Sequence, residues 1–244
     1  MANKLRRPGG ELSSRPLHFF WVVDCSGSMY GEKIGAVNNA IQSVIPEMVE
    51  AAYDNPNAVL LVRTLAFSSG ATWITPTPVP IEQFAWDDLD AGGITDMGEA
   101  FDLLAAQLTI PPMSDRALPP VIVLLSDGQP TDDYHHALEN LLSLPWGKKS
   151  VRIAIAIGQD ADYEVLREFT GNRELVLQAN NAEMLTKMIK WASTAAASVS
   201  APSSKVQSTA NDNLTIPKNN GTQMLNTEMI PDPNDTPIAE DDVW

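Results

Sequence analysis

The sequence predicts a doubly wound α/β fold, in which a mainly parallel sheet carries helices on both faces and one antiparallel strand at its edge. Two observations lead to this fold class. Strand-like apolar runs alternate along the chain with segments whose apolar residues recur at helical spacing, and such alternation is typical of a parallel sheet. The central runs are also too continuously apolar to leave one face in water, so helices must cover both faces.

The expected elements follow one another in a regular order. Strands are predicted at residues 17–23, 58–67, 72–75, 121–125, 151–157 and 174–178. The run at 72–75 follows a Ser-Ser-Gly turn, which favours an antiparallel edge hairpin. Helical periods lie within residues 34–48, 101–108, 137–142 and 184–189.

Composition divides the chain into three parts. We expect a polar leader at 1–15, one folded domain at 16–199 and an acidic, low-complexity tail at 200–244. The tail has seven acidic residues against two lysines, a net charge of −5, and shows no apolar period. Such a segment buries too little apolar surface to offset its ordering entropy, so it is predicted to be disordered unless a partner binds it.

Charge and cysteine content exclude several classes of function. The net charge of −15 repels nucleic acid and anionic membranes unless a local basic face overrides it, and no such face is visible in the sequence. The leader lacks the apolar stretch of a secretory signal, and residues 17–23 are too few to span a bilayer. A single cysteine excludes an internal disulfide framework. We therefore expect a cytoplasmic protein.

Oxygen-bearing side chains follow the predicted strands at the points where functional sites form in this fold class. Asp24, Ser26 and Ser28 follow the first strand, Asp127 follows the strand at 121–125, and Thr95 stands at the start of a helix. In open α/β sheets, ligands bind beyond the carboxyl ends of the strands. We expect all three loops to open at that edge.

These five residues form a predicted site for a hard divalent cation. Asp24, Ser26 and Ser28 alternate with single residues, so one curled loop can direct all three side chains inward. Mg²⁺ prefers octahedral oxygen ligands and usually keeps some waters, so two carboxylates and three hydroxyls leave room for an oxygen from another molecule. Mn²⁺ and Ca²⁺ are the alternative ions. The site is predicted to recruit an Asp or Glu carboxylate of a protein partner.

Three motifs resemble those of the von Willebrand factor A (VWA) domain family. DCSGS at 24–28 is similar to the DxSxS motif of the family's metal-ion-dependent adhesion site (MIDAS), TDMGEA at 95–100 to its threonine loop, and SDG at 126–128 to its second aspartate motif. The resemblance covers about residues 16–199 and implies a Rossmann-like fold with one antiparallel edge strand. It also implies that Ser26, Ser28 and Thr95 bind the metal most directly. One departure is Ile94, which separates the glycine pair from Thr95.

Further segments, among them SDGQPTDD at 126–133, resemble the bacterial tellurite-resistance TerY type. Relatives of that type are encoded beside a protein kinase and a protein phosphatase. The resemblance implies a cytoplasmic scaffold or adaptor in a phosphorylation-linked stress or defence system, with the kinase and phosphatase as possible partners.

Other interpretations of the same residues remain open. The alternative function is a Mg²⁺-dependent phosphotransferase of the haloacid-dehalogenase type with Asp24 as nucleophile, but that chemistry needs a second carboxylate at position 26, where Ser stands. We therefore expect no enzyme. Cys25 is expected to be a buried apolar side chain, and Asp132 and Asp133 are expected to lie in the first turn of their own helix. His135 and His136 are expected at the surface.

The tail offers a separate hypothesis. Residues 230–244 join prolines and acids to Trp244, a composition suited to an extended ligand that folds on binding with the tryptophan as its anchor. The alternative is a solvated segment with no role.

Overall fold

The computed structural model describes residues 14–55, 57–200, 230–231 and 244. It contains a sheet whose strand order is β3-β2-β1-β5-β6-β7, with β4 paired to β2 beside β3. The pairs β1–β2, β1–β5, β5–β6 and β6–β7 are parallel. The predicted doubly wound α/β fold class is confirmed. The strands are β1 (Arg15–Asp24), β2 (Ala58–Ser68), β3 (Gly70–Trp73), β4 (Val79–Pro80), β5 (Val121–Ser126), β6 (Val151–Ile157) and β7 (Val176–Ala179).

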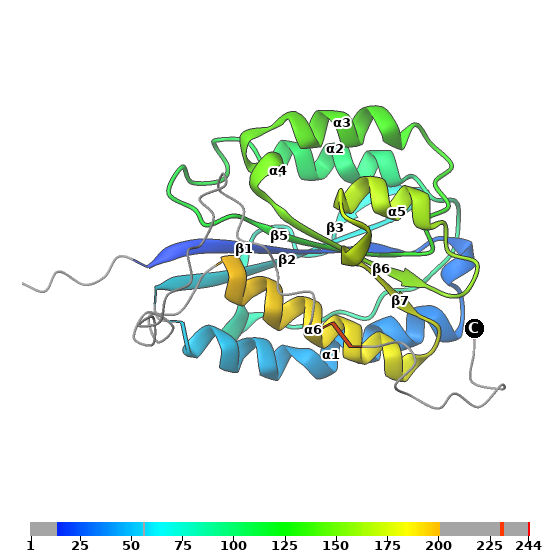
Figure 1. Ribbon diagram of the computed structural model, residues 1–244, viewed down its shortest axis with the longest axis horizontal. Helices are drawn as coiled ribbons and strands as arrows, with labels where there is room; N and C mark the ends of the chain where they lie inside the picture. The colour runs from blue at the N-terminus through cyan, green and yellow to red at the C-terminus, as the bar shows by residue number, and fades with distance from the viewer. Residues whose placement is uncertain (1–13, 56, 201–229, 232–243) are drawn as a thin grey trace, which may run out of the picture.

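Helices cover both faces of this sheet, as Figure 1 shows. On one face lie α1 (Glu32–Tyr53) and α6 (Ala182–Ser200), which pack side by side. On the other face lie α2 (Met97–Gln107), α3 (Tyr134–Ser143), α4 (Pro145–Lys149) and α5 (Tyr163–Thr170). Three short 3₁₀ turns complete the elements of the described residues: η1 (Gly27–Met29), η2 (Ile81–Gln83) and η3 (Arg173–Leu175).

Strand β1 illustrates why the central runs are continuously apolar. Its side chains alternate between the two faces, so Phe19 and Trp21 pack in the core beneath α1 and α6, whereas Phe20 and Val22 pack beneath the opposite helices. All four side chains have no exposed surface. A strand buried on both faces favours apolar residues at successive positions, so Phe19 to Val23 form an unbroken apolar run before Asp24.

The elements differ from the sequence expectations in a few places. The antiparallel hairpin of β2 and β3 is present, but the short strand β4, which also pairs antiparallel with β2, was not predicted. Helices α4 and α5 were missed because they have five and eight residues, too few for a periodic pattern to stand out. Residues 174–175 belong to η3, so β7 begins later than expected.

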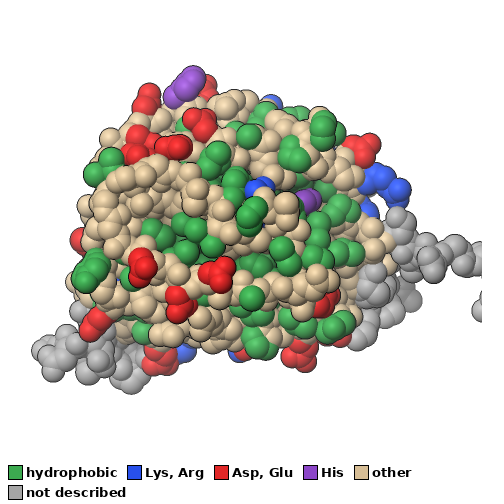
Figure 2. All heavy atoms as spheres, turned by 180° about the vertical axis from the view of Figure 1, so that it is seen from behind, with side chains coloured by type: hydrophobic (Ala, Val, Ile, Leu, Met, Phe, Trp, Pro, Cys, Tyr) green, Lys and Arg blue, Asp and Glu red, His purple; other side chains and the backbone are tan. Residues whose placement is uncertain are grey.

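The surface of the described chain agrees with its acidic composition. Figure 2 shows the face behind that of Figure 1, on which Asp and Glu side chains are scattered and Lys and Arg side chains form no continuous patch. Among the described residues, no helix combines the length and apolar character needed to cross a membrane. The predicted leader at 1–15 and tail at 200–244 lie almost wholly outside the described residues.

Two helical glycines should respond in opposite ways to alanine. A Cβ at Gly147 would lie 1.9 Å from the backbone oxygen of Leu141, whereas a Cβ at Gly35 in α1 meets nothing within 4 Å. We expect Gly147→Ala to lower the free energy of unfolding by about 1–3 kcal/mol or more through overpacking. Gly35→Ala should raise it by about 0.5–1 kcal/mol because alanine restricts the unfolded chain. Urea denaturation checks both, and a neutral Gly147→Ala would contradict the close packing of α4.

Candidate metal site

The candidate site lies where two neighbouring parallel strands end. Val23 of β1 pairs with Leu125 of β5, so the residues that follow them, Asp24 and then Ser126 and Asp127, reach the same edge of the sheet. Asp24 and Asp127 are both fully buried. As expected, tertiary structure brings together two carboxylates that lie about a hundred positions apart in the sequence.

Asp24 shapes the loop that follows β1. Its Oδ1 accepts a hydrogen bond from the backbone N–H of Ser26 at 2.8 Å, and its Oδ2 accepts one from the hydroxyl of Ser126 at 2.6 Å. Burial raises the pKa of Asp24 above its ordinary value and the charge of Asp127 adds to this rise, while the hydrogen bonds from Ser126 and Ser26 oppose it. Asp24 therefore acts first as an anchor of the loop.

The two serines of this loop place their hydroxyls together. Ser26 Oγ and Ser28 Oγ lie 3.0 Å apart. Ser26 is buried, while Ser28 is exposed. The pair therefore leads from the interior to the surface.

The segment that carries Thr95 is held between the other two loops. On one side, the N–H of Gly27 donates to Gly93 O at 3.1 Å, and the N–H of Gly92 donates to Cys25 O at 2.7 Å. On the other side, the N–H of Thr95 donates to Thr131 Oγ1 at 3.0 Å, and the N–H of Thr131 donates to Thr95 O at 2.9 Å. Thr131 belongs to the loop after Asp127, so hydrogen bonds join the three loops that carry the predicted motifs.

The extra isoleucine does not displace Thr95 from the interior. Ile94 is 51% exposed, whereas Thr95 is 5% exposed. The preceding Gly93 has φ +85°, and a Cβ there would lie 2.5 Å from Ser69 Oγ. The backbone can make this turn because position 93 is glycine.

Asp127 has the most unusual environment in the site. Both of its carboxylate oxygens are buried and lack a hydrogen-bond partner among the described residues. The ammonium of Lys33, in the first turn of α1, lies 4.0 Å from Asp127 Oδ2 and 3.5 Å from Asp160 Oδ1. A Cβ at Gly158 would lie 2.9 Å from Lys33 Nζ, so glycine at that position leaves room for the ammonium. Lys33 was not predicted as a site residue, because a lone lysine in a helix gives no signal in sequence.

These features fit a hard divalent cation. A buried carboxylate normally has hydrogen-bond partners or a metal, and Asp127 lacks the former. Among the described residues, no three His, Cys, Asp or Glu side chains gather around a common point that could hold a metal ion. A cation at this edge would consequently depend on the hydroxyls of Ser26, Ser28 and Thr95 as well as on the two carboxylates. Oxygen donors of this kind suit Mg²⁺, Mn²⁺ and Ca²⁺.

Asp132 has a different role from the one expected. Helix α3 begins at Tyr134, and the Asp132 carboxylate instead accepts the backbone N–H groups of Gly98 and Glu99 at 3.0 and 3.1 Å. It therefore caps the first turn of α2, which begins two residues after Thr95. The expectation failed because a sequence shows only the nearest helix. The free N–H groups that Asp132 satisfies belong to a helix some 34 positions earlier.

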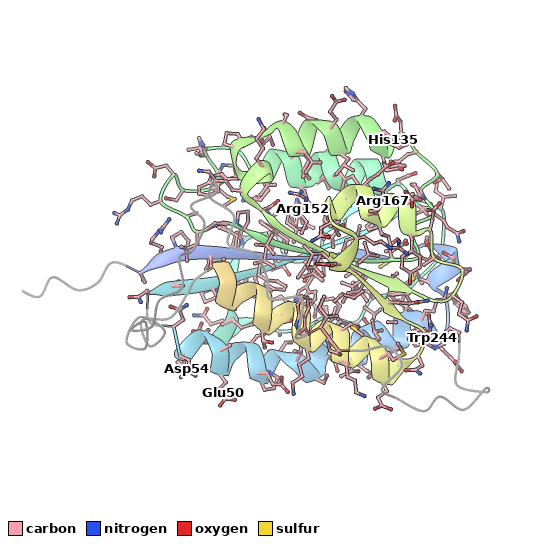
Figure 3. All side chains as sticks on the ribbon, in the orientation of Figure 1. Glu50, Asp54, His135, Arg152, Arg167 and Trp244 are labelled. Atoms are coloured by element: carbon pink, nitrogen blue, oxygen red, sulfur yellow. The ribbon has the colours of Figure 1, made fainter. Side chains whose placement is uncertain are left out.

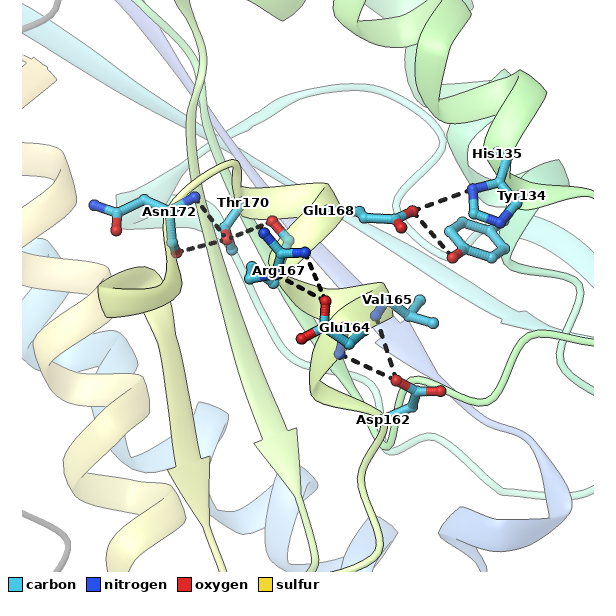
Figure 4. A network of polar contacts seen from close by, with 9 residues as sticks. All are labelled: Tyr134, His135, Asp162, Glu164, Val165, Arg167, Glu168, Thr170 and Asn172. Carbon is cyan, nitrogen blue, oxygen red and sulfur yellow. Dashed lines mark hydrogen bonds and ion pairs between the residues drawn. The ribbon is translucent and has the colours of Figure 1, made fainter.

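Helix α5 lies beside the Asp127 loop, and Figure 4 shows the polar contacts around this helix. The N–H of Asp162 donates to Asp127 O at 2.7 Å, and Asp162 Oδ1 caps α5 by accepting from the N–H groups of Glu164 and Val165. At the far end of α5, Glu168 Oε2 contacts His135 Nδ1 at 3.1 Å. His135 and His136 are exposed, as expected.

Cys25 is buried beside the site, as expected. Its side chain is 6% exposed, and burial raises the pKa of the thiol to about 12, with smaller contributions from the charges of Asp24 and Asp90. A thiol with such a pKa is not a nucleophile at neutral pH. Cys25 also lines a cavity of about 510 Å³ together with Asp88, Asp90 and Glu99.

Comparison with known proteins identifies the family. The model of the von Willebrand factor type A domain matches residues 20–191. The chain belongs to this family. The match includes all three loops of the site, and the VWA fold places them at the edge described above. No curated protein matches the sequence.

Solved structures share the VWA fold at low sequence identity. A von Willebrand factor type A protein from Catenulispora acidiphila superposes with a TM-score of 0.54 and 18% identity over 75% of this chain and 43% of that one. The proximal thread matrix protein 1 from the mussel byssus, described with a zinc-occupied MIDAS motif, gives a TM-score of 0.57 and 14% identity over 75% of this chain and 48% of that one. This chain thus spans less than half the length of either.

Ser126 should contribute strongly to stability. Its hydroxyl donates to Asp24 Oδ2 and accepts the N–H of Gly128 at 2.8 Å, and the whole arrangement is buried. Ser126→Ala leaves both groups unpaired, so we expect the free energy of unfolding to fall by about 2–4 kcal/mol. Ser143→Ala removes only an exposed hydrogen bond to Asn140 O and serves as the control. Equal urea midpoints for the two variants in EDTA would contradict this role.

Proposed function

We propose that the chain is a non-catalytic protein-binding module that depends on a divalent cation held by Asp24, Ser26, Ser28, Thr95 and Asp127. The observation that carries this proposal is the buried carboxylate of Asp127, which has no hydrogen-bond partner among the described residues and only the Lys33 ammonium at 4.0 Å as a counter-charge. It lies next to the buried carboxylate of Asp24, whose pKa is raised by burial and further by the charge of Asp127. Two like charges in a poorly solvated position are costly, and a cation between them removes the repulsion.

Each residue has a distinct part in this proposal. Asp24 holds the loop through Ser26 and Ser126, and the Ser26, Ser28 and Thr95 hydroxyls serve as neutral ligands. Asp127 contributes the second negative charge. A metal held by only two anionic groups stays electrophilic, and it would supply an open position for a carboxylate oxygen of the partner. Mg²⁺ is the ion we propose, with Mn²⁺ and Ca²⁺ as alternatives. The zinc named for the mussel protein makes Zn²⁺ a necessary competitor in any test.

The surface around the site suits contact with a protein. Tyr30, two residues after Ser28, is 78% exposed, and Ile94, next to Thr95, is 51% exposed. Aromatic and large aliphatic side chains at the centre of an interface often carry much of its binding energy. We propose that the partner's Asp or Glu reaches the metal while its apolar surface packs on these two side chains.

The phosphotransferase alternative finds little support in the geometry. A nucleophilic aspartate needs an accessible oxygen, but Asp24 is fully buried and each of its oxygens accepts a hydrogen bond. Ser26 supplies no carboxyl group for general-acid catalysis. The same burial that hides Asp24 from a substrate suits a residue that anchors a loop.

On the resemblance to the TerY type, we propose that the module is a cytoplasmic scaffold or adaptor in a kinase- and phosphatase-linked stress or defence system. The resemblance rests on segments such as residues 126–133. In the structure this segment contains Asp127 and the two residues, Thr131 and Asp132, that connect it to the Thr95 loop and to α2.

Metal binding should depend on the hydroxyl ligands. We expect Ser26→Ala and Thr95→Ala to weaken Mn²⁺ or Mg²⁺ binding at least about tenfold, because each removes an oxygen from the first coordination shell. Isothermal titration calorimetry measures the affinity, with Zn²⁺ and Ca²⁺ titrated in parallel. Ser143→Ala, on the exposed end of α3, is the matched control and should bind like the wild type. Unchanged affinity in both site variants would refute the metal assignment.

Partner binding should require both the metal and the loop of Asp24. In affinity capture from native cells, we expect a defined set of proteins to be retained by the wild type with Mg²⁺ and lost with EDTA. Asp24→Ala should lose the same set in Mg²⁺, since its loop no longer presents Ser26. A protein kinase or phosphatase within that set would support the scaffold proposal. A set retained equally by all three samples would contradict the mechanism.

A further inference from the structure

Trp244 packs against the domain itself. Its backbone N–H donates to Asn180 O at 3.1 Å, and its half-buried side chain packs on the core cluster that underlies α1 and α6. Figure 3 places Trp244 near the junction of β7 and α6. The sequence hypothesis assigned this tryptophan to a separate partner, whereas the structure shows it in contact with its own chain.

The acceptor for Trp244 sits in a well-defined turn. Gln178 Nε2 donates to Asn180 Oδ1 at 3.0 Å. The next residue, Asn181, is buried and caps α6, because its Oδ1 accepts the N–H of Met184 at 2.9 Å. The N–H of Gly158 also donates to Ala179 O at 2.9 Å, which connects this turn to β6. The carbonyl that receives Trp244 is therefore held in place by its neighbours before any segment docks.

Ile230 provides a second contact on the same face. It packs on the same core cluster as Trp244. In Figure 1 the segment 230–231, in red, lies across α6. Two apolar side chains from one segment thus meet the face that α1 and α6 form, while the sequence between them is acidic and contains Pro233 and Pro237.

We propose that the α1–α6 face carries a docking site for a segment anchored by tryptophan, and that Ile230 and Trp244 of this chain occupy it in cis. The site is separate from the candidate metal site and needs no cation. Because the segment is tethered, its effective concentration is on the order of 1 mM. Cis occupancy of about ten to one then corresponds to a dissociation constant in trans of about 100 μM.

Competition with a free peptide tests this proposal on the full chain. The probe is a fluorescein-labelled peptide with the sequence of residues 230–244, and its binding is followed by fluorescence anisotropy in EDTA. Trp244→Ala should bind the probe with a dissociation constant of about 100 μM or less, because its own segment has lost the anchor. The wild type should bind about tenfold more weakly, since its own segment competes.

Matched controls distinguish specific docking from non-specific binding of the probe. Tyr53, at the far end of α1, is 70% exposed, and Tyr53→Ala should bind the probe as weakly as the wild type. A probe in which alanine replaces the residue corresponding to Trp244 should lose binding to Trp244→Ala by at least about tenfold. Equal binding of the probe to the wild type and to Trp244→Ala, or no binding to either at 1 mM, overturns the proposal. A wild type that dimerises, with monomers formed by Trp244→Ala, would show docking between two copies and overturn occupancy in cis.

Discussion

Two buried carboxylates at the ends of neighbouring strands are the constraint on which the rest of this site depends. Parallel pairing of β1 with β5 sets Asp24 and Asp127 at one edge of the sheet, and helices on both faces keep water from them. Both carboxylate oxygens of Asp24 accept a hydrogen bond, whereas neither oxygen of Asp127 has a hydrogen-bond partner among the described residues. This asymmetry distinguishes the two residues: Asp24 fixes a loop, and Asp127 leaves negative charge available for the proposed cation.

The loops around these carboxylates are ordered by the protein's own hydrogen bonds. Cys25, Gly27 and Thr131 each make a backbone or side-chain contact with the segment 92–95, and Asp132 holds the start of α2. A site that is already assembled loses little conformational entropy when a ligand arrives. Lys33 contributes to the same end, because its ammonium lies near Asp127 and moderates the buried negative charge. This ammonium would repel a divalent ion, so it would lower the affinity of the site for the metal.

The first turn of α6 lies between two surfaces of different chemistry. This turn follows Asn180 and Asn181, at the same edge of the sheet as the loops of the candidate metal site. Trp244 contacts this turn from outside, so the face of α1 and α6 and the edge with the carboxylates are neighbouring but distinct surfaces. The first receives Trp244 through core side chains and the Asn180 carbonyl, and the second is built from oxygen side chains. Ligands of different chemistry suit each of them.

Much of the fold and of the candidate site could be predicted from the sequence. Continuous apolar runs indicated buried parallel strands because a strand packed on both faces cannot alternate with polar residues. The positions of Asp24 and Asp127 after such strands, and of Thr95 at the start of a helix, then predicted a shared edge, because parallel strands end on the same side. Short elements such as α4, α5 and β4 were missed, since a few residues carry too little periodicity to be recognised.

Contacts between distant segments were decided only by the tertiary structure. Asp132 looked like a cap for its own helix, but the N–H groups nearest to it in space are those of α2. Ser126 looked like the last residue of a strand, but its hydroxyl bridges Asp24 and Gly128. Trp244 stands 64 positions beyond Asn180, and no local sequence pattern indicates that its N–H donates to the Asn180 carbonyl. The sequence determines which residues are buried or turn-forming, whereas hydrogen-bond partners depend on how the completed sheet brings remote backbone groups together.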